Sequence, residues 1–188
     1  MKYIKIEEKH KELINFAKQY MTLIKDSEHD INHMKDVVEY TKKILDNIDE
    51  EVDIEACIIG AYWHDVGRTK IQEGHEKISA EMLSNTMKSL NYDETFIKKC
   101  YNSIEFHKWS MKPQTIEGLV VKDADKVAWL GTGRWNSCIK NKQRLDELLK
   151  LLPNLRNEIL HFEYTKKLYD EEIVKVLKIL YNEIYNIK

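Results

Sequence analysis

The stretch "DIEACIIGAYWHDVGR", Asp53–Arg68, decides how the chain folds. Over residues 54–65 apolar side chains lie on nearly every side of a helix, and a helix of that kind belongs in the centre of a fold. Asp53 is typical of an N-terminal helix cap. The helix ends on His64 and Asp65, and burying an imidazole beside a carboxylate costs free energy unless both are bound to something. The stretch therefore predicts a central helix that presents two ligands at its end.

The rest of the chain also favours helices. Only six Gly and two Pro occur in 188 residues, and no segment alternates between apolar and polar residues as a strand does. Helices are predicted over residues 6–25, 31–47, 54–65, 76–90, 93–108 and 114–130, and within 143–187, where the helix divides near Pro153. The predicted fold is a single all-α domain.

Composition limits the classes of protein to consider. A formal net charge of -2, with 43% hydrophobic and 33% charged residues, is typical of a soluble globular protein and makes nucleic acid an unlikely partner. No run approaches the ~18 apolar residues of a membrane span, and the charged N-terminal residues do not resemble a secretory signal. Cys57, Cys100 and Cys138 lie far apart, which favours three buried thiols in a reducing, cytoplasmic location.

Two further polar residues interrupt apolar helical stripes. His33 lies one turn before Val37, and Asp125 lies inside "VVKDADKVAWLG" at 120–131. Together with His64 and Asp65 they make a mixed nitrogen and oxygen ligand set. Such a set suits a divalent transition metal (Mn, Fe, Co, Ni or Zn) better than Mg.

The order of these motifs resembles a known family. "HMKDVV" at 33–38, "WHDVGR" at 63–68 and "DADK" at 123–126 are similar to the motifs of the HD-domain superfamily of metal-dependent phosphohydrolases. "GHEKISAEML" at 74–83 and "SIEFHKW" at 103–109 resemble small bacterial HD proteins that hydrolyse nucleotides, some of which are nucleoside triphosphate pyrophosphohydrolases.

This resemblance implies an HD-type helical bundle over residues 1–188, with a motif-bearing core at 29–133 and a C-terminal helical extension at 143–188. It also implies the metal ligands, which are His33, His64, Asp65 and Asp125. Similar proteins often read "DADRLDAIG" where this chain has "DADKVAWLG", and Trp109 and Trp129 are unusual. The shape of the pocket is therefore expected to be particular to this chain.

Two more histidines are candidates for the site. His107 lies on the inward face of its predicted helix, and His75 stands where the preceding helix starts. Either could protonate the leaving group or bind phosphates. Alternatively, both could hold a second metal ion, with Asp65 bridging the two ions.

The expected chemistry follows from the charges. A divalent ion lowers the pKa of its bound water from 15.7 to roughly 7, and Asp65 can contact both the ion and the water. The phosphates of a substrate need cations around them. Four candidates lie within a few positions of a ligand: Arg68, Lys70, Lys108 and Lys126.

The predicted function is metal-dependent hydrolysis of a small-molecule phosphate ester, with nucleoside triphosphate cleaved to monophosphate and pyrophosphate. Alternatives are a binuclear phosphodiesterase or dinucleotide hydrolase, a di-iron enzyme that activates oxygen, and a non-catalytic regulatory domain that retains the metal. Tyrosines in the C-terminal helices would form either a lid or the face of a homodimer. They are Tyr164, Tyr169, Tyr181 and Tyr185.

The remaining histidines are given simpler roles. His10 and His161 stand in charged segments and are predicted to lie on the surface. His29 and Asp30 precede His33. They either cap the helix that carries His33 or help to orient a ligand.

Overall fold

The computed structural model describes residues 1–26, 28–131, 149–150 and 152–185, and in this part of the chain no strand occurs. The longer helices are α1 (Lys2–Lys9), α2 (Lys11–Met21), α3 (Ile31–Leu45), α4 (Ile54–Trp63), α5 (His75–Ser89), α6 (Glu94–Ile104), α7 (Ile116–Ala128) and α10 (Glu163–Tyr185). A 3-10 turn, η1 (Val66–Thr69), follows α4, and a π-helical turn, η2 (Leu155–Ile159), precedes α10. The all-α prediction is confirmed.

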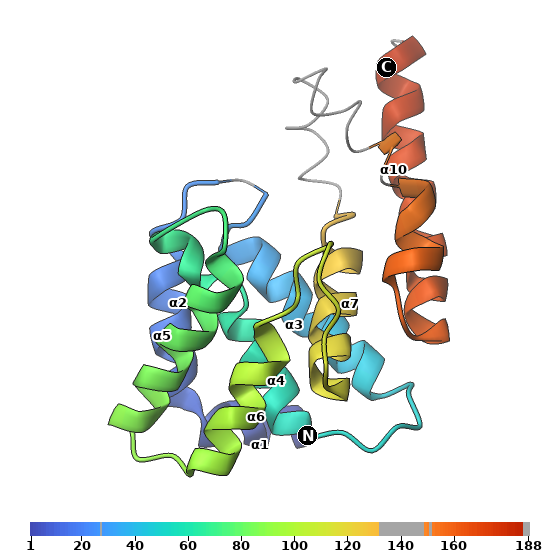
Figure 1. Ribbon diagram of the computed structural model, residues 1–188. Coiled ribbons are helices and arrows are strands. Elements are labelled where there is room, and N and C mark those ends of the chain that lie inside the picture. Colours follow the sequence, from blue (N-terminus) through green and yellow to red (C-terminus); the bar gives the residue numbers. More distant parts are fainter. Residues whose placement is uncertain (27, 132–148, 151, 186–188) are drawn as a thin grey trace.

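Helix α4 is the central element, as its sequence predicts (Figure 1). Every residue from Ala56 to Trp63 is buried, and α4 contacts α2, α3, α5, α6 and α7. Each large apolar side chain buried in this way stabilises the fold by about 1.5–3 kcal/mol. Asp53 caps the helix by accepting the backbone N–H of Ala56 at 3.1 Å. The end of α4 is therefore held firmly inside the bundle.

Other helices also begin on side-chain caps. Asp30 accepts the backbone N–H groups of Asn32 and His33 at 2.8 and 3.0 Å, so it caps α3 and fixes the first turn of that helix. Thr115 caps α7 by accepting the N–H of Gly118 at 3.2 Å. These caps set where α3 and α7 start, and both helices carry predicted ligands.

The prediction for His10 is wrong. Its ring is only 2% exposed, and the helix predicted over 6–25 breaks at this residue into α1 and α2. The two ring nitrogens lie 2.9 Å from the hydroxyl of Tyr92 and 2.9 Å from a carboxylate oxygen of Glu55. Partners 45 and 82 residues away along the chain bury the imidazole. Its charged local sequence gives no sign of them.

Several helix ends differ from the predicted ones by a few residues. Helix α4 stops at Trp63, so His64 and Asp65 lie in the turn that leads into η1. Helix α6 stops at Ile104, so His107 lies in the segment that connects α6 with α7. Cys57 and Cys100 are buried as predicted. Cys138, and the predicted helix start at residue 143, fall outside the described residues.

The C-terminal helix α10 packs against α7 at the edge of the bundle (Figure 1). Asp123 of α7 makes this contact, because one of its carboxylate oxygens accepts the N–H groups of His161 and Phe162 and the hydroxyl of Thr165, at 2.8, 3.0 and 2.6 Å. Burial raises the pKa of Asp123 to about 6, although these bonds lower it.

Among the described residues, no helix is both long enough and apolar enough to cross a membrane.

Two predictions about the C-terminal part have different outcomes. His161 is exposed, as expected. The tyrosines of the extension do not share one environment, because Tyr169 is buried and donates its hydroxyl to the carbonyl of Leu152 at 2.7 Å, whereas Tyr181 is exposed. A lid or a dimer face built from these tyrosines stays a prediction, as do the boundaries 29–133 and 143–188.

Candidate metal centre

Six buried histidine and aspartate side chains converge where α3, α4, α5 and α7 meet. His33 comes from the first turn of α3, His64 and Asp65 from the end of α4, and Asp125 from α7. His75 is the first residue of α5, and His107 follows α6. None of the six is more than 6% exposed.

His33, His64 and Asp125 form a first ligand group. The Nε2 atom of His33 lies 3.0 Å from Oδ1 of Asp125 and 3.4 Å from Nε2 of His64. The Nε2 atom of His64 lies 3.9 Å from the same carboxylate oxygen. Three ligand atoms therefore point toward one small volume.

Asp65, His75 and His107 form a second group. Oδ1 of Asp65 lies 3.0 Å from Nε2 of His75 and 3.7 Å from Nε2 of His107. The other carboxylate oxygen of Asp65 faces the first group, at 3.8 Å from His33 and 3.5 Å from His64. Asp65 therefore stands between the two groups with one oxygen directed at each.

Backbone carbonyls fix the orientation of three of the four imidazoles. The Nδ1 atoms of His64, His75 and His107 lie 2.9, 2.8 and 2.7 Å from the carbonyl oxygens of Ala61, Gln72 and Ile104. A carbonyl can only accept a hydrogen bond, so Nδ1 carries the proton in each neutral ring and Nε2 presents its lone pair to the centre. This arrangement is typical of histidines that bind a metal.

These residues fit a divalent cation. Among the described residues, Oδ2 of Asp65 and Nε2 of His75 are buried without a hydrogen-bond donor, and a buried polar atom left in that state costs free energy. Burial alone would raise the pKa of Asp65, but the charge of His64 and the imidazoles of His107 and His75 beside the carboxylate hold it well below its usual range. Burial lowers the pKa of His107, whereas the charge of Asp65 raises the pKa of His64 in spite of its burial. Carboxylate oxygens together with imidazole nitrogens make a donor set that suits a transition metal.

Comparison with known proteins shows the family of the chain. The model of the HD domain matches residues 30–130, which is more than half of the chain and includes all six candidate ligands. The chain belongs to the HD-domain family.

A solved structure of a "predicted HD superfamily hydrolase" from an uncultured Thermotogales bacterium superposes on this HD protein with a TM-score of 0.72. It is 20% identical, and the match covers 100% of both chains. At that identity the likeness shows the fold alone. No curated protein matches the chain. The family and the ligand groups together support a metal-dependent hydrolase.

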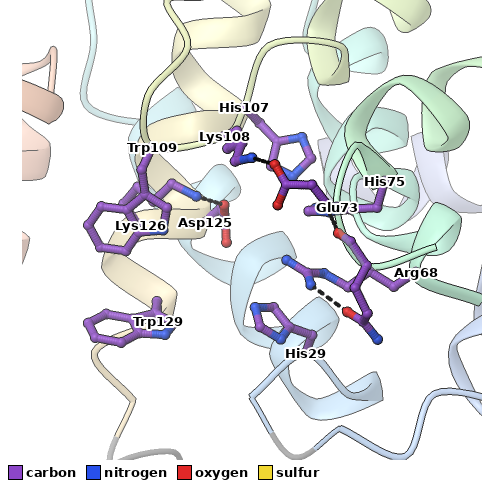
Figure 2. A pocket seen from close by; sticks show the side chains of 11 residues that line it. His29, Arg68, Glu73, His75, His107, Lys108, Trp109, Asp125, Lys126 and Trp129 are labelled. Carbon is purple, nitrogen blue, oxygen red and sulfur yellow. Dashed lines mark hydrogen bonds and ion pairs between the residues drawn. The ribbon is translucent and has the colours of Figure 1, made fainter. Parts of the chain in front are cut away.

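A cavity of about 490 Å³ opens above the ligands of this HD domain (Figure 2). Its size lies within the usual range of ligand pockets, about 300–1,000 Å³. Its lining comprises His29, Arg68, Gln72, Glu73, His75, His107, Lys108, Trp109, Asp125, Lys126 and Trp129. The cavity therefore combines metal ligands, cations and two indole rings.

Three of the four predicted phosphate-binding cations line this cavity. Arg68 donates from Nε to Asp65 at 2.8 Å and from Nη1 to Gln72 at 3.0 Å. The ammonium of Lys126 pairs with Asp125. Lys108 pairs with Glu73. The fourth, Lys70, is exposed and lines a neighbouring cavity instead, so the structure does not bring it to the ligands.

Sequence reasoning missed two acidic neighbours of the site. Glu73 lines the cavity and holds Lys108. Glu76 is 1% exposed, and its oxygens lie 3.8 Å from Nδ1 of His75 and 4.0 Å from Nζ of Lys108. The available signal was their position in the sequence, two residues before and one residue after His75. His29 also lines the cavity, and its ring meets that of His33 edge-on at 5.8 Å.

Proposed function

We propose that this HD protein hydrolyses nucleotides with a bound divalent metal, cleaving nucleoside triphosphates to monophosphates and pyrophosphate. One observation carries the proposal. Asp65 directs one carboxylate oxygen at each of two buried ligand groups, and members of both groups line a cavity that also contains cations. The family resemblance to nucleotide-hydrolysing HD proteins supports the choice of substrate.

The chemistry divides between the metal and the chain. A divalent ion held there would supply a nucleophilic water near neutral pH and offset phosphate charge. Asp65, ionised and anchored by Arg68, would hold the ion and accept hydrogen bonds from the water. Lys108 and Arg68 would bind the phosphates, and the guanidinium of Arg68 can donate to two phosphate oxygens at once.

The position of the cations favours cleavage at the α-phosphorus. Arg68 and Lys108 line the same cavity as His75, so the tail of a triphosphate can lie along them. The departing pyrophosphate then has its charge neutralised, and this stabilises the transition state. The expected products are monophosphate and pyrophosphate without a diphosphate intermediate. Stepwise release of orthophosphate would contradict this geometry.

The test of the proposed function is Asp65→Ala, with Asp49→Ala, an exposed loop carboxylate, as the matched control. Elemental analysis and a screen of nucleoside mono-, di- and triphosphates are run on the purified proteins, with phosphate and pyrophosphate measured separately. We expect Asp65→Ala to lose both metal and hydrolysis, and Asp49→Ala to keep both. Full metal occupancy in Asp65→Ala would reject the assigned ligands.

A second candidate is a binuclear phosphodiesterase. The distances of 3.0 and 3.7 Å from Asp65 to His75 and His107 favour it, because they form a second complete group. If both groups hold an ion, the metal content should approach two per chain and fall toward one in His107→Ala. A content of one in both proteins would assign His75 and His107 to substrate binding or proton transfer.

A further inference from the structure

Two tryptophans form an aromatic wall in the cavity. Trp109 belongs to the segment between α6 and α7, and Trp129 follows α7 directly. Their rings meet edge to face, with centroids 5.4 Å apart and planes at 86°. Figure 2 shows both indoles on one side of the cavity and Arg68 and Glu73 on the other, with Asp125 between them.

The wall is held at a defined place relative to the metal ligands. The ammonium of Lys126 lies 5.0 Å from the ring centroid of Trp109 and pairs with the ligand Asp125. The ammonium of Lys122, which is 5% exposed, donates to the backbone carbonyls of Trp109 and Met111. Trp109 therefore contacts α7 in two ways, because Lys126 lies over its ring and Lys122 donates to its backbone carbonyl. A surface fixed in this way is preorganised to bind a rigid ligand.

The chemistry of the metal does not need this wall. Neither indole lies in a ligand group. Trp129 is only 4% exposed and belongs to the hydrophobic core, whereas Trp109 packs against that core and stays partly exposed. Trp109 therefore supplies the accessible aromatic face, and Trp129 supports it from behind. Inorganic polyphosphates and sugar phosphates have no flat apolar surface to set against an indole. A nucleobase has one, and stacking on aromatic side chains is a general mode of binding bases.

We propose that Trp109, supported from behind by Trp129, forms the subsite for the base of a nucleotide whose phosphates lie at Arg68 and Lys108. This inference rests on the proposed function, and it identifies the residues that select the substrate. Every base has a π-face, so such a subsite tolerates all bases and prefers those that stack most strongly. Purine nucleotides therefore bind more tightly than pyrimidine nucleotides.

The test uses the full-length protein loaded with metal. Trp109→Ala removes the wall and Trp109→Phe keeps an aromatic face, while Met111→Ala changes an exposed side chain of the same segment. Binding of adenosine and cytidine monophosphates is measured by calorimetry. Hydrolysis is measured with adenosine triphosphate and with inorganic triphosphate, which carries similar charge without a base. Metal content is checked in every variant.

We expect Trp109→Ala to weaken nucleotide binding and to raise the KM of the nucleoside triphosphate by about 10- to 100-fold, the loss of one base–aromatic stack. Metal content is retained, turnover of inorganic triphosphate falls much less than turnover of the nucleoside triphosphate, and Trp109→Phe recovers most of the binding. Met111→Ala behaves as wild type.

Equal losses on both triphosphates, or unchanged nucleotide binding, would overturn the subsite. Wild-type protein that cleaves inorganic triphosphate and does not bind nucleotides would also overturn it, while metal-dependent hydrolysis of phosphate compounds would stand. Wild-type protein that binds nucleotides through Trp109 and cleaves neither triphosphate would instead reject the proposed function and support the subsite.

Discussion

Gly67 is the glycine of the HDVGR motif, and we predict that Gly67→Ala disturbs the metal centre without touching a ligand. A Cβ atom at this position would lie 2.3 Å from the backbone oxygen of His75 and 2.6 Å from the backbone nitrogen of Ser79. Both atoms belong to the main chain of α5, so no side chain can rotate away. The start of α5 must therefore move outward by roughly 1 Å, because Cβ contacts under 3.0 Å essentially never occur.

Two costs add up in this variant. Forcing an extra carbon into a packed interior costs about 1–3 kcal/mol. The N–H of Gly67 also donates to the hydroxyl of Ser79 at 2.8 Å, and weakening that bond costs about 1 kcal/mol. We expect the free energy of unfolding to fall by about 2–4 kcal/mol. A displacement of roughly 1 Å at His75 should lower turnover on the order of 100-fold.

Urea denaturation followed by circular dichroism measures the stability, and nucleotide hydrolysis at saturating metal measures the turnover. Ser79→Ala is the control, because it removes the same hydrogen bond without adding volume. It should lose about 1 kcal/mol and keep its activity. If Gly67→Ala has the same stability and activity as Ser79→Ala, the close approach of η1 to α5 does not cause the loss predicted for Gly67→Ala.

Three further predictions concern other parts of the chain. Asp123→Ala leaves two backbone N–H groups without their acceptor, so urea denaturation should show a loss of about 2–4 kcal/mol. Wild-type stability would mean that α10 is held by other contacts. Cys57 and Cys100 are buried, and burial raises the pKa of both thiols, so mass spectrometry should find neither alkylated by iodoacetamide until urea is added. Lys108→Met should reduce kcat/KM about tenfold for triphosphates and less for monophosphates, because the shorter substrate has fewer charges to pair. Equal effects on both substrates would place Lys108 away from the pyrophosphate tail.

Local patterns in the sequence determined the helices and most of the candidate metal ligands. The apolar surface of residues 54–65 predicted the buried central helix, which the structure places at Ile54–Trp63, because a segment without a polar side cannot face water. His33, His64 and Asp125 were visible as polar residues in apolar stripes, and Asp65 followed His64 directly. A polar side chain that interrupts a buried stripe needs a partner, and this requirement can be read without knowing the fold.

Only the tertiary structure decided how these residues meet. His33 and Asp125 are 92 residues apart, and the packing of α3 against α7 brings them within 3.0 Å. The contacts of α4 with α3 and of η1 with α5 place Asp65 so that one of its oxygens faces each ligand group. Local sequence also predicted an exposed His10, which long-range partners bury, and a phosphate-binding Lys70, which lies outside the cavity. The direction of a side chain at a turn depends on neighbours that are distant in the sequence. Helical periodicity does not predict which residues those neighbours are.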